Sequence, residues 1–235
     1  MKKYFVWVSM LFMMLLVLPA FAKISFIKIK KPGLSEERIA EGIKEALRVG
    51  TENSVKQTGC RDGYFGNPMI KILMPEKLQK AEKTLRNAGY GSKVDEFILS
   101  MNRAAEQAAP FAKDIFWDAV KQMSFEEVGK IWKGHDTAAT EYFRLKTYDQ
   151  LKFTFKPVVT EAMNKVQVTR KYKELELHAK RIPFVKVEMV DLDEYVVTKA
   201  LDGLFYMLGE EEKRIRKEPA ARVTRILKEV FGSSE

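Results

Sequence analysis

Asn102, Arg103 and Glu106 fall within one turn of a segment with helical periodicity, close enough for their side chains to act together. An amide, a guanidinium and a carboxylate can face a ligand or a partner's backbone. They can also form a buried network that fixes helix register. Structural networks are common in helical cores, so we favour the second interpretation and keep all three residues as candidate contacts.

A second polar group begins at His135 and Asp136 and continues through Thr137 and Thr140. A histidine and an aspartate beside hydroxyls suggest catalysis or a metal, but two ligands are too few for a metal site. We therefore predict that Asp136 caps the next helix by accepting hydrogen bonds from its first amides. We expect His135 to lie in solvent. Asp136, Thr140 and the nearby Tyr142 are candidate ligand or partner contacts.

Asp202 interrupts an apolar helical stretch, where a carboxylate needs a partner. Arg214, Arg216 and Arg222 from the C-terminal segment could each supply one. We favour a structural salt bridge over a site. Asp202, Arg214 and Arg222 complete the set of candidate contacts.

Charged residues elsewhere are interpreted mainly as solvated faces. Glu210–Arg214 and Glu212–Arg216 are pairs four residues apart in the favourable order, so part of that run is expected to be exposed. Basic groups at residues 23–31 and 170–181 could meet an anionic lipid surface or a polysaccharide, and we favour a solvated face for both.

The elements that must position these residues are helices. Residues 92–123 carry an Ala-rich seam with heptad spacing, made of Val94, Ile98, Met101, Ala105, Ala108, Ala112, Ile115 and Ala119. Pro110 and Trp117 lie on the opposite face, and Pro110 should kink the helix. A helix that is apolar on two sides is usually central in its domain.

The other segments give an all-α prediction: a single multi-helix domain of about eight to nine helices around the central Pro-kinked helix. We predict two short extended pieces at most, at residues 69–74 and 185–189. Further helices are expected at residues 35–56, 75–88, 124–134, 137–146, 167–180, 191–217 and 219–232, and one more begins at 147 and bends or breaks at Pro157. Capping boxes are expected at Ser124/Glu127 and Asp191/Glu194.

Composition narrows the function classes. Apolar residues make up 46% of the 235 residues and charged residues 31%, which excludes a disordered chain. One cysteine excludes an internal disulfide framework and a thiolate metal cluster, and two histidines exclude a three-histidine site. We favour Cys60 as a half-buried small apolar residue over a reactive thiol or an intermolecular disulfide. The formal charge of +9 favours anionic partners.

The N-terminal residues have the pattern of a cleaved secretory signal. Lys2 and Lys3 precede an apolar run at residues 4–18, and small residues at 20 and 22 predict cleavage between Ala22 and Lys23. The run is short for an uncleaved membrane anchor. We therefore expect a signal peptide at 1–22, a basic segment at 23–33, a helical domain at 34–232 and a tail at 233–235. The mature chain would be periplasmic or secreted, without a transmembrane segment and without a nucleic-acid partner.

Several ordered strings resemble a known family. They are residues 102–106 (NRAAE), 136–140 (DTAAT) with Tyr142 and Phe143, 202–205 (DGLF), 211–216 (EEKRIR) and 219–222 (PAAR). The chain resembles domain-of-unknown-function family 4197 of bacterial secreted proteins, from about Gly33 to Gly232. The resemblance implies a helical domain in the Gram-negative envelope and carries no catalytic residues. Some relatives look like lipoproteins, whereas no cysteine follows the apolar run here.

These observations leave three function hypotheses. The first is a non-enzymatic binding or interaction protein for a hydrophobic ligand or an envelope partner, in a groove beside the Ala-rich seam. The second is an enzyme that uses buried carboxylates such as Glu106 or Asp202 with a nearby arginine. The third is a structural component that dimerises through an apolar face. No phosphate loop, nucleophile elbow or zinc-protease motif occurs, so we assign no catalytic, cofactor or metal residue.

Overall fold

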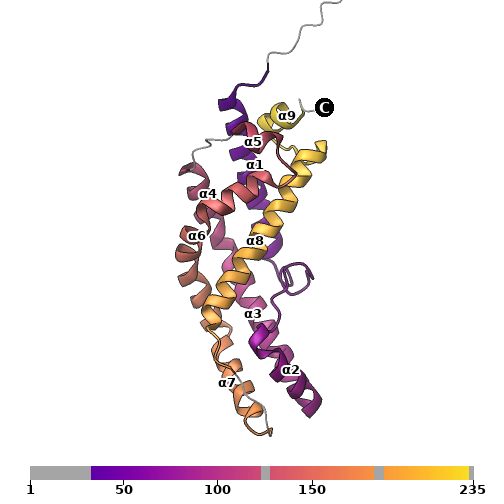
Figure 1. Ribbon diagram of the computed structural model, residues 1–235, viewed down its shortest axis with the longest axis vertical. Helices are drawn as coiled ribbons and strands as arrows, with labels where there is room; N and C mark the ends of the chain where they lie inside the picture. Colours follow the sequence, from indigo (N-terminus) through magenta and orange to yellow (C-terminus); the bar gives the residue numbers. More distant parts are fainter. Residues whose placement is uncertain (1–32, 123–127, 183–187, 233–235) are drawn as a thin grey trace, which may run out of the picture. The chain divides into compact units, whose positions relative to one another are not determined.

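Ser35 caps the first helix as predicted, because its hydroxyl accepts a hydrogen bond from the Arg38 amide at 3.2 Å. The computed structural model (Figure 1) describes residues 33–122, 128–182 and 188–232. Those ranges contain nine α-helices and no β-strand, which confirms the all-α prediction. The helices are α1 (Glu36–Thr58), α2 (Gln79–Leu85), α3 (Gly91–Ala108), α4 (Ala112–Gln122), α5 (Val128–Lys133), α6 (Ala138–Lys165), α7 (Val168–Ala179), α8 (Leu192–Lys217) and α9 (Arg225–Gly232).

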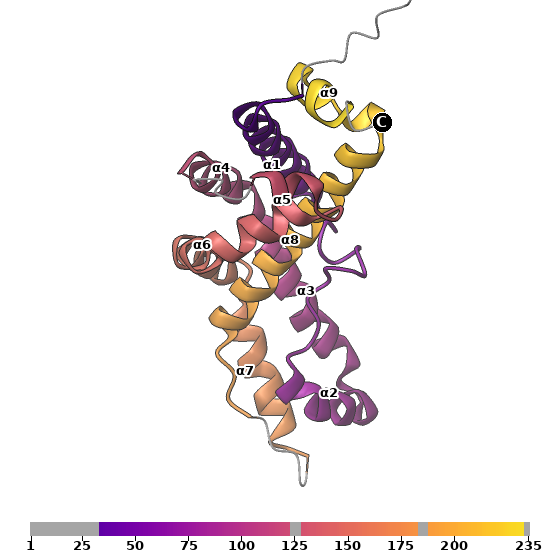
Figure 2. The ribbon, with the colours of Figure 1, turned by 45° about the horizontal axis from the view of Figure 1, so that its top comes forward.

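Helix α8 packs against both α1 and α6 (Figures 1 and 2). It begins at the predicted cap, where the Asp191 carboxylate accepts a hydrogen bond from the Glu194 amide at 2.9 Å. Gly50 lets α1 approach closely, since a Cβ there would lie 2.7 Å from Leu208 Cδ1. More than half of the residues of α8 are buried, and the others leave one face of the helix uncovered.

The predicted kink at Pro110 is present and is a full interruption. A short 3₁₀ turn, Ala109–Phe111, separates α3 from α4. Proline lacks the amide that would continue the α-helical ladder, which explains the break. The predicted seam is buried on both sides of it except for Ile115, which is half-buried.

Helix α6 differs from its prediction. The two expected helices, with a boundary at Thr147, form one continuous helix that contains Pro157. Pro157 lies on the exposed face, so water can satisfy the Phe153 carbonyl that loses its donor. The capping box at Ser124 and Glu127 lies outside the described residues, as do positions 185 and 187 of the second predicted extended piece.

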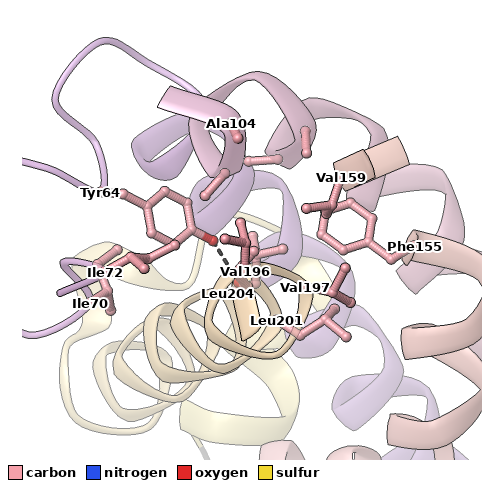
Figure 3. Close-up of a cluster of buried hydrophobic side chains, with 14 of the residues drawn as sticks. Tyr64, Ile70, Ile72, Ala104, Phe155, Val159, Val196, Val197, Leu201 and Leu204 are labelled. Atoms are coloured by element: carbon pink, nitrogen blue, oxygen red, sulfur yellow. Dashed lines mark hydrogen bonds between the residues drawn. The ribbon is translucent and has the colours of Figure 1, made fainter. Parts of the chain in front are cut away.

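The first extended piece, predicted at residues 69–74, is not a strand: residues 68–70 form a turn and residues 71–75 have no regular secondary structure. It packs against the main core, in which Tyr64, Ile70 and Ile72 face α8 from one side while Phe155 and Val159 of α6 face it from the other (Figure 3). A smaller cluster joins α1 to α9. Within the described ranges, no helix has the length and apolarity that a membrane span requires.

Candidate ligand-binding cleft

The Asn102 side chain holds the extended segment in place. Its Oδ1 accepts a hydrogen bond from the Ile72 amide at 2.8 Å, and its Nδ2 donates to the Ile72 carbonyl at 2.7 Å. The same nitrogen also donates to the Ile98 carbonyl within α3 at 2.8 Å. The buried amide thus does for Ile72 what a neighbouring β-strand would do. These contacts fit the structural interpretation of Asn102.

Glu106 and Arg103 hold the loop that follows α1. Glu106 Oε1 accepts hydrogen bonds from the amides of Tyr64 and Phe65 at 3.2 and 3.1 Å, and Oε2 accepts from Arg103 at 2.5 Å. Arg103 also pairs with Asp62 at 2.7 Å. Both carboxylate oxygens of Glu106 are therefore occupied by scaffold groups.

Tyr64 fastens that loop to α8. Its ring is fully buried and its hydroxyl donates to the Ala200 carbonyl at 2.6 Å (Figure 3). Burial, with the charges of Glu106 and Asp202, raises the pKa of the Tyr64 hydroxyl above its ordinary value, so it remains a donor. A Cβ at Gly203 would lie 2.6 Å from the Tyr64 ring, so this contact requires glycine.

The cap of α6 comes from Glu212, not from Asp136. Buried Glu212 accepts hydrogen bonds from the amides of Ala139 and Thr140 at 3.0 and 2.7 Å and from the Thr140 hydroxyl at 2.7 Å. Asp136 instead pairs with Lys217, whose hydrogen bond lowers the pKa of that carboxyl. The predicted cap was wrong because the free amides at the start of α6 already donate to the Glu212 carboxylate of α8.

The acidic and basic run at the end of α8 is more buried than predicted. Glu212 pairs with Arg216 at 2.8 Å as expected, but the pair lies in the interior. Buried Glu211 accepts hydrogen bonds from the side chains of Asn53, Gln57 and Arg214. Part of the run is solvated as predicted, at Lys213 and Arg214, whereas the Glu212–Arg216 pair is not, and Glu210 pairs with Lys213 in place of Arg214.

Arg222 caps the end of α8. It is buried and donates to the carbonyls of Ile215 and Arg216 at 3.0 and 2.9 Å, two of the carbonyls that a helix end leaves without amide partners. Arg214 is half-exposed and pairs with Glu211 and Glu218. In the described part of the chain, the hydrogen bonds of Asp202 come from Arg144 and Tyr148.

Asp202 pairs with Arg144 of α6, whereas a partner from the C-terminal segment was predicted. The Arg144 guanidinium donates to Asp202 Oδ1 at 2.5 Å and lies over the rings of Tyr148 and Phe205, 5.0 and 5.5 Å from their centroids. Tyr148 donates to the same oxygen at 3.3 Å. Helix α6 supplies the partner because it packs directly beside this part of α8.

A cleft of about 870 Å³ lies along the remaining face of α8. One side is the segment around residues 69–79, the other is the first two turns of α6, and Met189 to Asp191 lie at one end. Its floor on α8 includes Tyr195, Lys199, Asp202, Tyr206 and Gly209. From Tyr195 to Glu210 the floor is about 22 Å long, from the rise of an α-helix.

The wall at residues 69–74 combines buried and exposed apolar side chains. Ile72 is buried, Ile70 and Met74 are buried and border the cleft, and Met69 and Leu73 line it while 64% and 57% exposed. The Tyr195 hydroxyl donates to the Leu73 carbonyl at 2.9 Å and ties the wall to α8. Met189, 93% exposed, adds a further apolar side chain.

Two of the nine predicted contacts, Thr140 and Asp202, line the cleft. The other seven do not: Asn102, Arg103, Glu106, Asp136, Tyr142, Arg214 and Arg222. Tyr142 is half-buried with the Lys146 ammonium 5.5 Å from its ring centroid. Of the stripe Tyr195, Lys199, Asp202 and Tyr206, only Asp202 was predicted as a contact, although the spacing of four, three and four marks one helix face.

Cys60 and His135 both lie at the surface. Cys60 is exposed and its Sγ donates to the Gln57 carbonyl at 3.2 Å, so the prediction of half-burial was wrong. His135 is exposed as predicted and lies 3.3 Å from Glu141. Among the described residues, no group of three or more His, Cys, Asp and Glu side chains could hold a metal ion.

Comparison with known proteins gives one match. No curated protein and no solved structure matches the chain. The model of the family described as protein of unknown function (DUF4197) matches residues 33–232, which span every described helix and both walls of the cleft. The chain therefore belongs to the DUF4197 family.

Proposed function

We propose that the protein is an exported, non-enzymatic binding protein whose cleft along α8 receives a hydrophobic ligand. The observation that carries this proposal is the set of exposed apolar side chains on the cleft, Met69, Leu73 and Met189. The volume of the cleft, about 870 Å³, falls within the range of small-molecule sites. Unbranched methionine side chains adapt to apolar ligands of different shapes.

The buried carboxylates support binding more than catalysis. Glu106 has both oxygens occupied by backbone and arginine donors and does not line the cleft. Asp202 lines it but is paired with Arg144. A general base needs a free oxygen within reach of a substrate proton, and Glu106 offers none.

A neutral fluorescent probe such as N-phenyl-1-naphthylamine tests the cleft directly. We expect the wild-type protein to bind it and the double variant L73E/M189E to bind it at least tenfold more weakly, because two carboxylates would replace the apolar wall. The matched control is L145E/F153E, which places the same charges on exposed apolar positions of α6 outside the cleft, 81% and 84% exposed. Equal binding by all three proteins would contradict the proposal.

Export is the second part of the proposal. The signal pattern at residues 1–22 supports cleavage between Ala22 and Lys23. N-terminal sequencing of the chain from a periplasmic fraction should begin Lys23-Ile24-Ser25. A chain that keeps Met1 and remains in the cytoplasm would contradict export.

A further inference from the structure

The methionines of the protein fall into two groups by exposure. Met69 and Met189 are exposed, and both line the cleft along α8, although they come from segments far apart in the sequence. The other methionines of the described residues are at most 9% exposed: Met74, Met101, Met163 and Met207. Within the described part of the chain, every exposed methionine therefore lies on the cleft.

Exposure decides which thioethers a dissolved oxidant can reach. Hydrogen peroxide transfers one oxygen atom to a thioether: a sulfur lone pair forms the S–O bond, the O–O bond breaks, and the rest of the peroxide leaves as water. The sulfur loses two electrons and the peroxide gains them. The product, methionine sulfoxide, is a polar side chain where an apolar one stood.

Sulfoxides at these two positions would alter the surface that receives the hydrophobic ligand. The exposed apolar side chains of the cleft are Met69, Leu73 and Met189, so oxidation can change two of the three. A ligand that covers a sulfoxide oxygen takes water from a strong hydrogen-bond acceptor and offers no donor in return, which opposes binding. Cys60, which is also exposed, does not line the cleft.

We propose that Met69 and Met189 are oxidation sites that control the cleft: peroxide converts both to sulfoxides, and the cleft then loses its affinity for apolar ligands. This inference rests on the proposed function and adds its regulation. Methionine sulfoxide reductases return sulfoxides to thioethers, so the change is reversible.

Peptide mapping by mass spectrometry and probe titration test the two halves of this proposal separately. The mature chain carries C60S, which removes its one thiol, and is treated with hydrogen peroxide before titration with N-phenyl-1-naphthylamine. We expect one added oxygen atom at Met69 and at Met189 before any at Met101 or Met163. Probe binding should weaken about tenfold, because two side chains lose their apolar contact. Treatment with the reductases should restore it.

The matched control is M69L/M189L in the same C60S chain. Leucine keeps an apolar side chain of similar volume and has no sulfur to oxidise. The untreated variant should bind the probe about as tightly as the untreated C60S protein, and peroxide should leave its binding unchanged.

The remaining outcomes would overturn the proposal in distinguishable ways. Unchanged probe binding after both sites are oxidised would overturn the control of the cleft and leave its binding function intact. An equal loss of binding in M69L/M189L would place the sensitive group elsewhere. A loss that coincides with a fall in the melting temperature of the treated protein would show unfolding instead of a changed cleft. Failure of the untreated protein to bind the probe would overturn the proposed function as well.

Discussion

Single buried polar residues decide where the cleft walls stand. The Asn102 amide takes both backbone groups of Ile72, so the wall segment is fixed without a partner strand. The Glu212 carboxylate takes two amides at the start of α6 and fixes the opposite wall. Both side chains act on backbone, which explains why they are buried and yet lie outside the cleft.

Replacement of Asn102 by alanine should destabilise the protein by about 3 kcal/mol, because the Ile72 amide and carbonyl would be left buried without partners. It should also weaken probe binding, since the wall would no longer be held. Urea unfolding and probe fluorescence measure the two effects. N164A on the exposed face of α6 should change stability by less than about 0.5 kcal/mol. A stable N102A variant with unchanged binding would refute this role.

Replacement of Glu212 by alanine should cost about 3–5 kcal/mol, the range for removing one member of a buried ion pair, since Arg216 loses its carboxylate and α6 loses its cap. E218A, exposed at the end of α8, serves as its control and should be nearly neutral. Chemical unfolding of both variants gives the comparison. Equal stability of the two would show that the cap contributes little.

Prediction at the residue scale worked where partners are local in sequence. The caps at Ser35 and Asp191 bind amides three residues away, and both were found. The Glu212 cap and the Asp202–Arg144 pair join residues 72 and 58 positions apart, respectively. Spacing along one chain does not reveal contacts of that length, so Asp136 and the C-terminal arginines were chosen instead.

At the scale of elements, α9 docks on α1 through a very close contact. A Cβ at Gly42 would lie 2.7 Å from both γ-carbons of Val230. The branched valine side chain is stiff, so α9 would have to move. The outer edge of the same contact is held by Arg38 and Glu229, paired at 2.6 Å.

G42A should therefore destabilise the protein by about 1–3 kcal/mol through overpacking. Adding G42A to V230A should cost less stability than adding G42A to wild type, because the methyl groups removed from Val230 make room for the new one. A double-mutant cycle measured by thermal unfolding tests the coupling. Strictly additive effects would show that the two residues do not press on each other.

The Arg38–Glu229 pair makes the docking of α9 depend on pH. Hydrogen bonding to Arg38 lowers the pKa of the Glu229 carboxyl below its ordinary value of 4.5. A carboxyl with a lowered folded-state pKa stabilises the fold fully above its ordinary value and loses that effect as the pH falls through the lowered value. At pH 7, wild type should therefore have a slightly higher melting temperature than E229Q. This difference should shrink as the pH falls into the acid range. A difference that grows in acid would contradict the pairing.

At the scale of the whole molecule, the fold followed from helical periodicity and proline positions. The seam, the Pro110 interruption and the bounds of α8 all matched, because local propensity and tertiary packing agree there. The cleft could not be predicted from the sequence, because it forms where the 69–79 segment and α6, which are distant along the chain, both meet α8. The exposed stripe on α8 was visible in its spacing, but its neighbours were not.

Native mass spectrometry of the mature chain, purified under non-denaturing conditions beside L73E/M189E, tests the central claim most directly. We predict that wild-type protein carries an extractable hydrophobic ligand and that the variant is bare, because its apolar wall is broken. L145E/F153E should carry the same ligand as wild type. A wild-type chain that carries no ligand, or a variant that carries the same ligand in the same amount, would contradict a binding function for the cleft along α8.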